Sequence, residues 1–311
     1  MSKNLRLGTR GSALALWQAN WTKSELETQY AGLAVELVPI KTTGDKILDV
    51  PLASIGGKGL FTKELDEALL DGRIDLAVHS LKDVPFQLPD GIELAAVPAR
   101  EDPRDAFISD GRKLHELAAG SKIGTSSLRR QVQLRHRFPV LDLVTLRGNV
   151  DTRLRKVAAG DFDGILLAAA GLKRLGYESR IVQYLEDDIM ISAVGQGALG
   201  IVCRGDDSAT TALLSVLDHA ESRAAITAER ALLRCLGGSC QVPVAGRARV
   251  HGQQLLLKGL IASLDGRRVV SHETSGPIDQ AHALGLDLGQ TLLAMGAGEI
   301  LAEIAAANPE Q

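Results

Sequence analysis

The chain has 311 residues, more than one typical hydrophobic core accommodates, so we expect two or three domains. Hydrophobic residues make up 45% and charged residues 23%, as in ordinary globular proteins, and no apolar run approaches the roughly 18 residues that span a bilayer. A net charge of −3 and an aromatic content of 3% argue against a general nucleic-acid binder with base-stacking surfaces.

The first hundred residues alternate short apolar strands with helical patterns, which predicts βαβ units and mainly parallel sheets. Ser12 can cap the first helix, which starts at residue 13, and Gly72 ends a second helix over 60–72. Because the sequence enters a strand at once, we expect no signal or transit peptide. Strands are expected at 5–9, 35–40, 74–80 and 93–98.

The same layout restarts near residue 121, where "IGTSS" repeats the earlier "LGTRGS". A strand and helix at 121–138, a strand at 141–148, a helix at 149–160 and a strand with a helix at 162–176 follow. We therefore expect two α/β lobes of similar plan that face each other across a cleft. Segments 99–107 and 191–207 would link the lobes as a double hinge, which suits closure around a ligand.

Three domains follow from this organisation. The first α/β lobe takes residues 1–99 and 200–217, the second takes 100–199, and a smaller α+β C-terminal domain takes 218–311. A helix near 209–217 belongs to the first lobe. The C-terminal domain combines an amphipathic helix over 221–238 with a last helix rich in Ala and Leu, and with strands at 244–252, 254–263 and 267–275.

A polar group follows the strand that ends in "HSLKDVP", where Ser80, Lys82 and Asp83 lie together. In open α/β sheets, ligands bind at the carboxyl ends of strands. A carboxylate there can act as a general acid and base, or stabilise a developing cation. A surface turn with a Lys–Asp pair is an equally good interpretation of the spacing.

Positive charge is concentrated between Leu128 and Lys156, where seven Arg and one Lys face two Asp, a local charge of +6. Hydroxyls, helix N-terminal amides and guanidinium groups together favour an anion site for a ligand with several carboxylates or phosphates. For a single Arg, a solvated helix face is the simpler reading, and Ser or Thr often only caps a helix. The candidate residues are Thr125, Ser126, Ser127, Arg129, Arg130, Arg147 and Arg153, with Arg10 and Ser12 as a smaller set.

Other motifs carry no chemistry. "GGKGLF" lacks the pattern of a nucleotide P-loop, and "VGQGALG" is interpreted as hinge or close packing. The seven histidines show no ligand spacing with cysteine, so no metal site is expected.

The three cysteines differ in setting, which argues against a disulfide framework and favours a reducing cytoplasm. Cys203 lies in an apolar strand, and Cys235 belongs to a helix, so both suit packing. Cys240 follows "GGS" in a turn that should expose it, so it suits covalent attachment best.

Six motifs occur in an order that resembles the porphobilinogen deaminase, or hydroxymethylbilane synthase, family: "HSLKDVP", "IGTSSLRRQ", "LRGNVDTRL", "AAAGLKRLG", "VGQGALGI" and "CQVPVAG". The openings "RLGTRGSALALWQ" and "GGKGLFTKELDEALL" are also similar. The resemblance covers nearly the whole chain and is weakest in the last hundred residues outside the cysteine loop. It implies two lobes like those of periplasmic binding proteins and a third domain that carries the cysteine.

The resemblance implies a transferase of porphyrin and heme biosynthesis. Four porphobilinogen molecules would be joined head to tail, with loss of ammonia, on a dipyrromethane primer held through a thioether to Cys240. Hydrolysis would then release the linear tetrapyrrole hydroxymethylbilane to the next enzyme. It further implies a cytoplasmic monomer that binds a small molecule and neither nucleic acid nor membrane.

Site residues follow from the same resemblance. Asp83 would be the catalytic acid, stabilising the cation that forms as ammonia leaves and moving protons. Besides Cys240, the cofactor would be held by Ser80, Lys82, Asp83, Thr125, Ser127, Arg129, Arg130 and Arg153. The incoming substrate would be held by Arg10, Ser12, Lys58, Arg147, Arg174 and Gln196.

The chain departs from the family pattern beside the cysteine loop. Leu236 and Ser239 stand near places where family members often carry an acidic residue and Gly, and Cys235 adds a second thiol five residues before Cys240. Ser239 is small and should be tolerated, and the match to "CQVP" favours Cys240 over Cys235 as the anchor.

Two rival functions remain open from the residues alone. A two-lobed binding protein without catalysis would capture a polycarboxylate and carry no covalent adduct. A nucleic-acid binder using residues 128–156 would bind with a strong dependence on salt.

Overall fold

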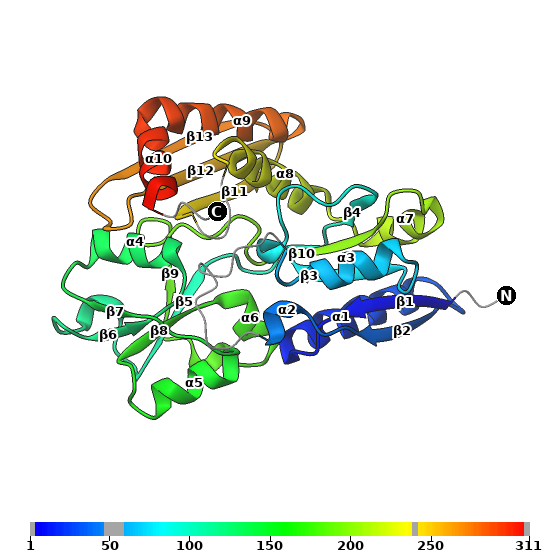
Figure 1. Ribbon diagram of the computed structural model, residues 1–311, viewed down its shortest axis with the longest axis horizontal. Helices are drawn as coiled ribbons and strands as arrows, with labels where there is room; N and C mark the ends of the chain where they lie inside the picture. Colours follow the sequence, from blue (N-terminus) through cyan, green and yellow to red (C-terminus); the bar gives the residue numbers. More distant parts are fainter. Residues whose placement is uncertain (1–3, 47–58, 238–241, 308–311) are drawn as a thin grey trace. The chain divides into compact units, whose positions relative to one another are not determined.

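A computed structural model describes residues 4–46, 59–237 and 242–307 (Figure 1). The described residues form two compact units, one of 4–46, 59–101 and 197–223 and the other of 102–196, 224–237 and 242–307. The chain thus passes between the units within both segments predicted as linkers. The domain boundaries predicted from the sequence stay predictions.

The first unit is built on a five-stranded sheet in the order β2-β1-β3-β10-β4. Strand β1 runs parallel to β2 and β3, whereas β10 runs antiparallel to β3 and β4. The strands are β1 (Asn4–Thr9), β2 (Ala34–Pro39), β3 (Leu76–Ser80), β4 (Ile92–Ala96) and β10 (Leu199–Arg204). The helices are α1 (Ala13–Gln29), α2 (Thr43–Lys46), α3 (Lys63–Leu70) and α7 (Ser208–Leu214), with 3₁₀ turns η2 (Leu81–Asp83) and η5 (Ser215–Leu217).

Helices cover both faces of this sheet because its strands are apolar on both sides. Leu76 and Val78 of β3 pack in a buried cluster with Ala19 and Leu26 of α1, while Ala77 faces the cluster of α3. The predicted cap of α1 is confirmed, since the Ser12 hydroxyl accepts a hydrogen bond from the Ala15 amide at 3.3 Å.

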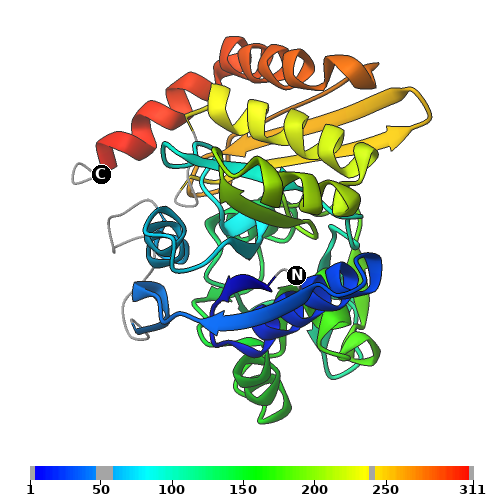
Figure 2. The same ribbon diagram turned by 90° about the vertical axis from the view of Figure 1, so that its right-hand side faces the viewer.

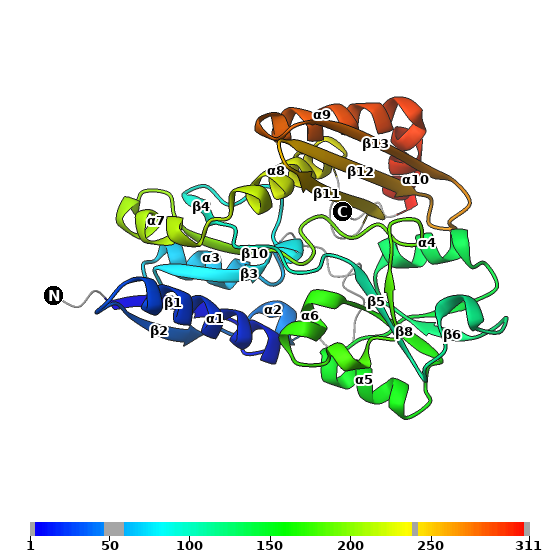
Figure 3. The same cartoon turned by 180° about the vertical axis from the view of Figure 1, so that it is seen from behind.

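The second unit contains a five-stranded sheet in the order β7-β6-β8-β5-β9. Helix α4 packs against one face, in a cluster with Phe107 and Leu166, and α5 and α6 pack against the other, with Ile108 and Leu167 (Figure 3). The strands are β5 (Asp105–Ser109), β6 (Lys122–Gly124), β7 (Asp142–Val144), β8 (Gly164–Ala168) and β9 (Gln183–Leu185). The helices are α4 (Leu128–Arg137), α5 (Val150–Ala158) and α6 (Ala169–Arg174).

The two sheets share one plan, as predicted. In the first sheet, β1 lies between β2 and β3, and the antiparallel strand β10 lies next to β3. In the second sheet, β6 lies between β7 and β8, and the antiparallel strand β5 lies next to β8. The expectation of mainly parallel sheets is wrong, because each sheet pairs two ladders of each direction. The antiparallel strands β5 and β10 begin just after the chain has entered the unit from the other one.

Both antiparallel strands fall partly or wholly inside segments predicted as linkers. Strand β5 begins at residue 105 of the segment 99–107, and β10 lies within 191–207. The charged run and Pro103 before β5 are typical of a loop, and its first residue, Asp105, is buried in contact with arginines distant in sequence. The glycines of "VGQG" do serve a turn, since Gly195 and Gly197 have φ of 74° and 86°.

The C-terminal part of the second unit is α+β, as predicted. Its antiparallel sheet has the order β11-β12-β13, and helices α8 and α9 pack on that sheet through a cluster that includes Leu232, Leu257 and Leu288 (Figure 2). The strands are β11 (Val244–His251), β12 (Gln254–Ala262) and β13 (Val269–Pro277). The helices are α8 (Ala220–Cys235), α9 (Ala281–Leu292) and α10 (Gly298–Ala307).

The predicted class, two α/β lobes and a smaller α+β domain, is therefore confirmed. Among the described residues, none of the helices combines the length and apolar character needed to cross a membrane.

Candidate polyanion-binding site

In the first unit, the predicted polar residues gather at one edge of the sheet. Ser80 ends β3, and Lys82 and Asp83 lie half-buried in the turn η2 that follows. Ser80 is held in place, since its hydroxyl accepts a hydrogen bond from Gln18 Nε2 of α1 at 2.7 Å. Because β3 and β1 are parallel neighbours, their carboxyl ends share this edge.

Arg10 and Ser12 follow the carboxyl end of β1. The Arg10 guanidinium stacks on the Phe61 ring, 4.2 Å from its centroid, which orients the cation. The Ser12 hydroxyl already serves as the helix cap, so its predicted contact with substrate would share that oxygen.

A residue that the sequence did not single out, His79, lies buried beside this edge with 6% of its surface exposed. Its Nε2 has no hydrogen-bond partner among the described residues. Burial, together with the positive charge of Arg10, lowers the pKa of His79 to about 4. His79 is therefore neutral at pH 7, and the field of Arg10 reaches into this region.

In the second unit, the predicted turn before α4 presents its polar groups in three different ways. The Thr125 hydroxyl accepts from the Ser127 amide at 3.2 Å, and the Ser126 hydroxyl donates to Leu146 O at 2.5 Å. Ser127 occupies the N-cap position, yet its side chain makes no capping bond. Simple helix capping thus does not account for Ser127.

Arg129 and Arg130 lie in the first turn of α4, and each is only 6% exposed. Both pair with the fully buried carboxylate of Asp105 at the start of β5. Arg129 donates to its two oxygens at 2.7 and 3.2 Å, and Arg130 Nε donates to Oδ1 at 2.9 Å. The alternative prediction, that each arginine lies on a solvent-exposed helix face, is wrong for these two arginines. It is correct for Arg137 and Arg155, which are exposed.

Two further arginines extend this positive cluster. The pKa of Arg153 is lowered to about 10 by burial and by the charges of Arg130 and Arg147. Arg147 Nε is buried and has no hydrogen-bond partner among the described residues. Four guanidinium groups and the carboxylate of Asp105 leave a surplus of three positive charges within this group. An anionic ligand would satisfy both the unpaired nitrogen and the surplus charge.

The remaining predicted residues are spread along the second unit or lie outside the described residues. Arg174 ends α6 and is half-buried, and Gln196 is 1% exposed. Gln196 Nε2 donates to Pro103 O at 2.7 Å and to Asp105 Oδ1 at 3.1 Å. Lys58 and Cys240 lie outside the described residues.

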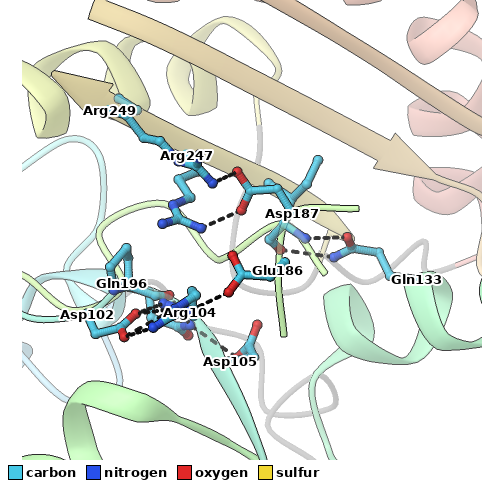
Figure 4. A network of polar contacts seen from close by, with 12 residues as sticks. Asp102, Arg104, Asp105, Gln133, Glu186, Asp187, Gln196, Arg247 and Arg249 are labelled. Carbon is cyan, nitrogen blue, oxygen red and sulfur yellow. Dashed lines mark hydrogen bonds and ion pairs between the residues drawn. The ribbon is translucent and has the colours of Figure 1, made fainter. Parts of the chain in front are cut away.

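Polar contacts join the segment that follows β9 to strand β11 (Figure 4). Asp187 accepts from Arg247 and Arg249, both at 2.5 Å. Arg104 binds Asp102 at 2.6 Å and also pairs with Glu186.

A buried acid, Glu229 of α8, adds a second connection. Its carboxylate is fully buried and accepts from the amides of Gly195 and Ala248, each at 2.7 Å. The polypeptide that follows Cys240 is thus tied to the linker through charge-assisted hydrogen bonds.

The sequence does not point to Asp105, Asp187 or Glu229 as site residues, because their partners are distant in sequence. A weak signal existed for Asp105, since an acid at the first position of the apolar run "DAFIS" needs a buried partner. No group of three or more metal-ligating His, Cys, Asp or Glu side chains occurs in the described part of the chain. The arginine cluster of the second unit is suited to the binding of a molecule with several carboxylates.

Two protein-family models match this chain. Residues 5–212 match the one described as "Porphobilinogen deaminase, dipyromethane cofactor binding domain", and residues 223–294 match "Porphobilinogen deaminase, C-terminal domain". A curated relative named porphobilinogen deaminase, from Syntrophotalea carbinolica, is 57% identical over 304 residues, which cover 97% of this chain and 96% of the relative. Relatives of the same name from Trichlorobacter lovleyi and Geobacter sulfurreducens are each 56% identical, covering 97% and 96% of this chain and 97% and 94% of their own lengths.

Solved structures similar to this chain include solute-binding proteins. The probable amino-acid ABC transporter extracellular-binding protein ytmK of Bacillus subtilis matches with a TM-score of 0.42 and 7% identity, over 70% of this chain and 90% of its own. The L-cystine solute receptor of Neisseria gonorrhoeae matches with a TM-score of 0.40 and 14% identity, over 70% and 85%.

Proposed function

The chain belongs to the porphobilinogen deaminase family, and from that membership we infer that it is a hydroxymethylbilane synthase, a transferase of tetrapyrrole biosynthesis that carries a dipyrromethane cofactor. Such an enzyme joins four porphobilinogen molecules head to tail, with loss of ammonia, and releases the linear tetrapyrrole by hydrolysis. Of the two rival functions, this membership excludes a binding protein without catalysis.

We propose that Cys240 is the anchor of the cofactor. The observation that supports a polycarboxylate cofactor is the buried arginine cluster, with its surplus charge and the unpartnered Nε of Arg147. When bound, the dipyrromethane supplies the pyrrole carbon to which the first substrate unit is joined. In the second unit, the residues proposed to hold it are Thr125, Ser127, Arg129, Arg130 and Arg153, and in the first unit Ser80, Lys82 and Asp83.

A second set of residues is proposed to hold the incoming substrate. Porphobilinogen carries an acetate and a propionate, and guanidinium groups bind carboxylates through two parallel hydrogen bonds, which orients each ring. The stacking of Arg10 on Phe61 supports such a fixed orientation. The proposed residues are Arg10, Ser12, Lys58, Arg147, Arg174 and Gln196.

Asp83 is proposed as the catalytic residue. Loss of ammonia leaves an electron-poor cation on the substrate, and a carboxylate close to the pyrrole nitrogens stabilises that cation and takes up or returns protons. The position of Asp83 directly beyond β3, on the same edge as Arg10, supports this role.

The test of this function is an intact-protein mass measured before and during turnover of porphobilinogen. We expect a resting mass of the polypeptide plus two pyrrole units, then successive additions of one pyrrole unit, with hydroxymethylbilane as product. A protein that turns over porphobilinogen with a bare polypeptide mass would contradict the covalent cofactor. No consumption of porphobilinogen would contradict the function itself.

We further propose that the protein is a monomer of the cytoplasm whose product passes to the next tetrapyrrole enzyme. The free thiols of Cys203 and Cys235 support a reducing compartment. Sedimentation of the purified enzyme at its working concentration tests the monomer, and a dimer would contradict it.

A further inference from the structure

Both buried arginines of α4 share the carboxylate of Asp105. It lies 24 residues before Arg129, at the start of β5, and its side chain has no exposed surface. Gln196 is the third side chain that donates a hydrogen bond to it, at 3.1 Å. The carboxylate is therefore held from β5, α4 and the segment before β10 at once.

The contacts of the two arginines are divided between Asp105 and backbone carbonyls. Arg129 Nη1 also donates to Ile191 O at 2.7 Å, and Arg130 Nη1 donates to Leu166 O at 2.9 Å. Each guanidinium has five N–H groups. The contacts with Asp105 and these carbonyls engage three of them on each arginine, so within the described part of the chain two on each are left for a ligand.

Two adjacent buried cations would repel each other without a shared counter-charge. An uncompensated buried charge is strongly destabilising, and an arginine without its partner would turn toward solvent or toward other acceptors. The two arginines hold the pKa of Asp105 far below its usual range, so this carboxylate stays ionised at every working pH. Asp105 thus supplies a permanent negative charge beside the two arginines, whether or not a ligand is bound.

From this arrangement we propose that Asp105 is a positioning residue: it holds Arg129 and Arg130 so that their remaining N–H groups take a carboxylate of the cofactor. This inference rests on the proposed function, in which these two arginines bind the dipyrromethane. Asp105 does not touch the cofactor in this scheme and acts only through the guanidinium pair. Asp105 also neutralises one of the four arginine charges, so a net charge of +3 is left in the cluster to attract the carboxylates of the ligand.

The test compares Asp105→Asn with Asp75→Asn. Asp75 is a matched control, because it is partly buried, is bonded to Arg6 at 2.7, 2.8 and 3.1 Å, and belongs to the first unit rather than to the unit that holds the arginine cluster. For each folded variant, the fraction of protein that carries the cofactor is read from the intact mass, and kcat is referred to the loaded fraction. We expect Asp105→Asn to lose about tenfold in loading, or about tenfold in kcat per loaded molecule, while Asp75→Asn keeps both.

Asp105→Glu keeps the charge and moves it by one methylene group. If Asp105→Asn does not fold, this variant carries the test, and we expect full folding with loading or kcat reduced by at least about threefold. Full loading and unchanged kcat in both folded Asp105 variants would overturn the proposal, as would an equal loss in Asp75→Asn. Absence of a pyrrole adduct and of turnover in the wild type would instead overturn the proposed function.

Discussion

At the scale of single residues, three buried titratable groups have pKa values shifted in ways that depend on their neighbours. Asp105 is kept ionised by two arginines, whereas Asp66 of α3 is 7% exposed and burial raises its pKa to about 6. Burial also lowers the pKa of His79 to about 4. The difference follows from the partners, because only Asp105 faces cations whose attraction outweighs its loss of hydration.

The role of Asp83 is tested by Asp83→Asn, which keeps the shape and removes the charge. We expect cofactor-loaded protein to persist while kcat falls by at least about a hundredfold, because the cation formed on ammonia loss is no longer stabilised. Steady-state kinetics with porphobilinogen, together with the intact mass, measures both effects. Asp90→Asn, in the exposed turn before β4, serves as control. Near-normal turnover would remove Asp83 from the mechanism.

The anchor is tested by Cys240→Ser beside Cys235→Ser. We expect Cys240→Ser to fold and to retain no pyrrole unit, since a hydroxyl forms no thioether and is a far weaker nucleophile than a thiolate. Cys235→Ser should keep the full adduct. Mass spectrometry of the intact proteins decides, and an adduct retained in Cys240→Ser would move the anchor to Cys235.

At the scale of elements, the C-terminal domain depends on glycines where α9 meets α8. A Cβ on Gly285 would lie 2.2 Å from Ala228 O and 2.7 Å from Ala231 Cβ, so the two helices approach too closely for a side chain. Gly289 is similar, with Cys235 Sγ 2.7 Å from the Cβ position. This close approach packs Leu288 and Leu292 into the core of the domain.

Gly285→Ala therefore tests the helix packing. We expect a loss of about 2 kcal/mol in the free energy of unfolding, because α9 must move away from α8 and leave its core partly unfilled. Gly298→Ala, at the start of α10, is the control, since its nearest neighbour is Leu293 Cδ2 at 3.9 Å. That control should change stability by less than about 1 kcal/mol, in the stabilising direction. Urea denaturation measures the free energy of unfolding of both variants. If Gly285→Ala were as stable as the wild type, the close approach of α9 to α8 would be contradicted.

At the scale of the whole molecule, two of the described groups have opposing effects on the pH dependence of stability between pH 7 and pH 5. His79 has a folded pKa of about 4, below its usual 6.5, so only the unfolded chain binds the proton and stability falls as pH drops from 6.5 toward 4. Asp66 has a folded pKa of about 6, above its usual 3.8, so the folded chain binds the proton first and stability rises as pH drops over a similar range. The two effects nearly cancel between pH 7 and pH 5.

Asp66→Asn should expose the effect of His79. We expect the free energy of unfolding of this variant to fall by about 2 kcal/mol from pH 7 to pH 5, while that of the wild type changes by less than about 1 kcal/mol. Thermal or urea unfolding at both pH values gives the comparison. The free energy of unfolding of the double variant Asp66→Asn/His79→Gln should again be nearly independent of pH. If the wild type lost as much stability from pH 7 to pH 5 as Asp66→Asn does, the cancellation would be refuted.

The sequence by itself determined the local elements and the kinds of residue at the site. The repeated strand–turn–helix layout, the cap at Ser12 and the stop at Gly72 were predictable because they depend on neighbours a few residues apart. The concentration of arginines in 128–156 was visible as composition alone.

Only the tertiary structure decided which charges are buried and what neutralises them. Asp105 meets Arg129, and Glu229 meets the amides of Gly195 and Ala248, across separations that no local pattern encodes. The same holds for β5 and β10, whose antiparallel pairing depends on where the chain re-enters each sheet. Local periodicity fixes a strand's two faces, but its direction and its charged partners are set by elements distant in the chain.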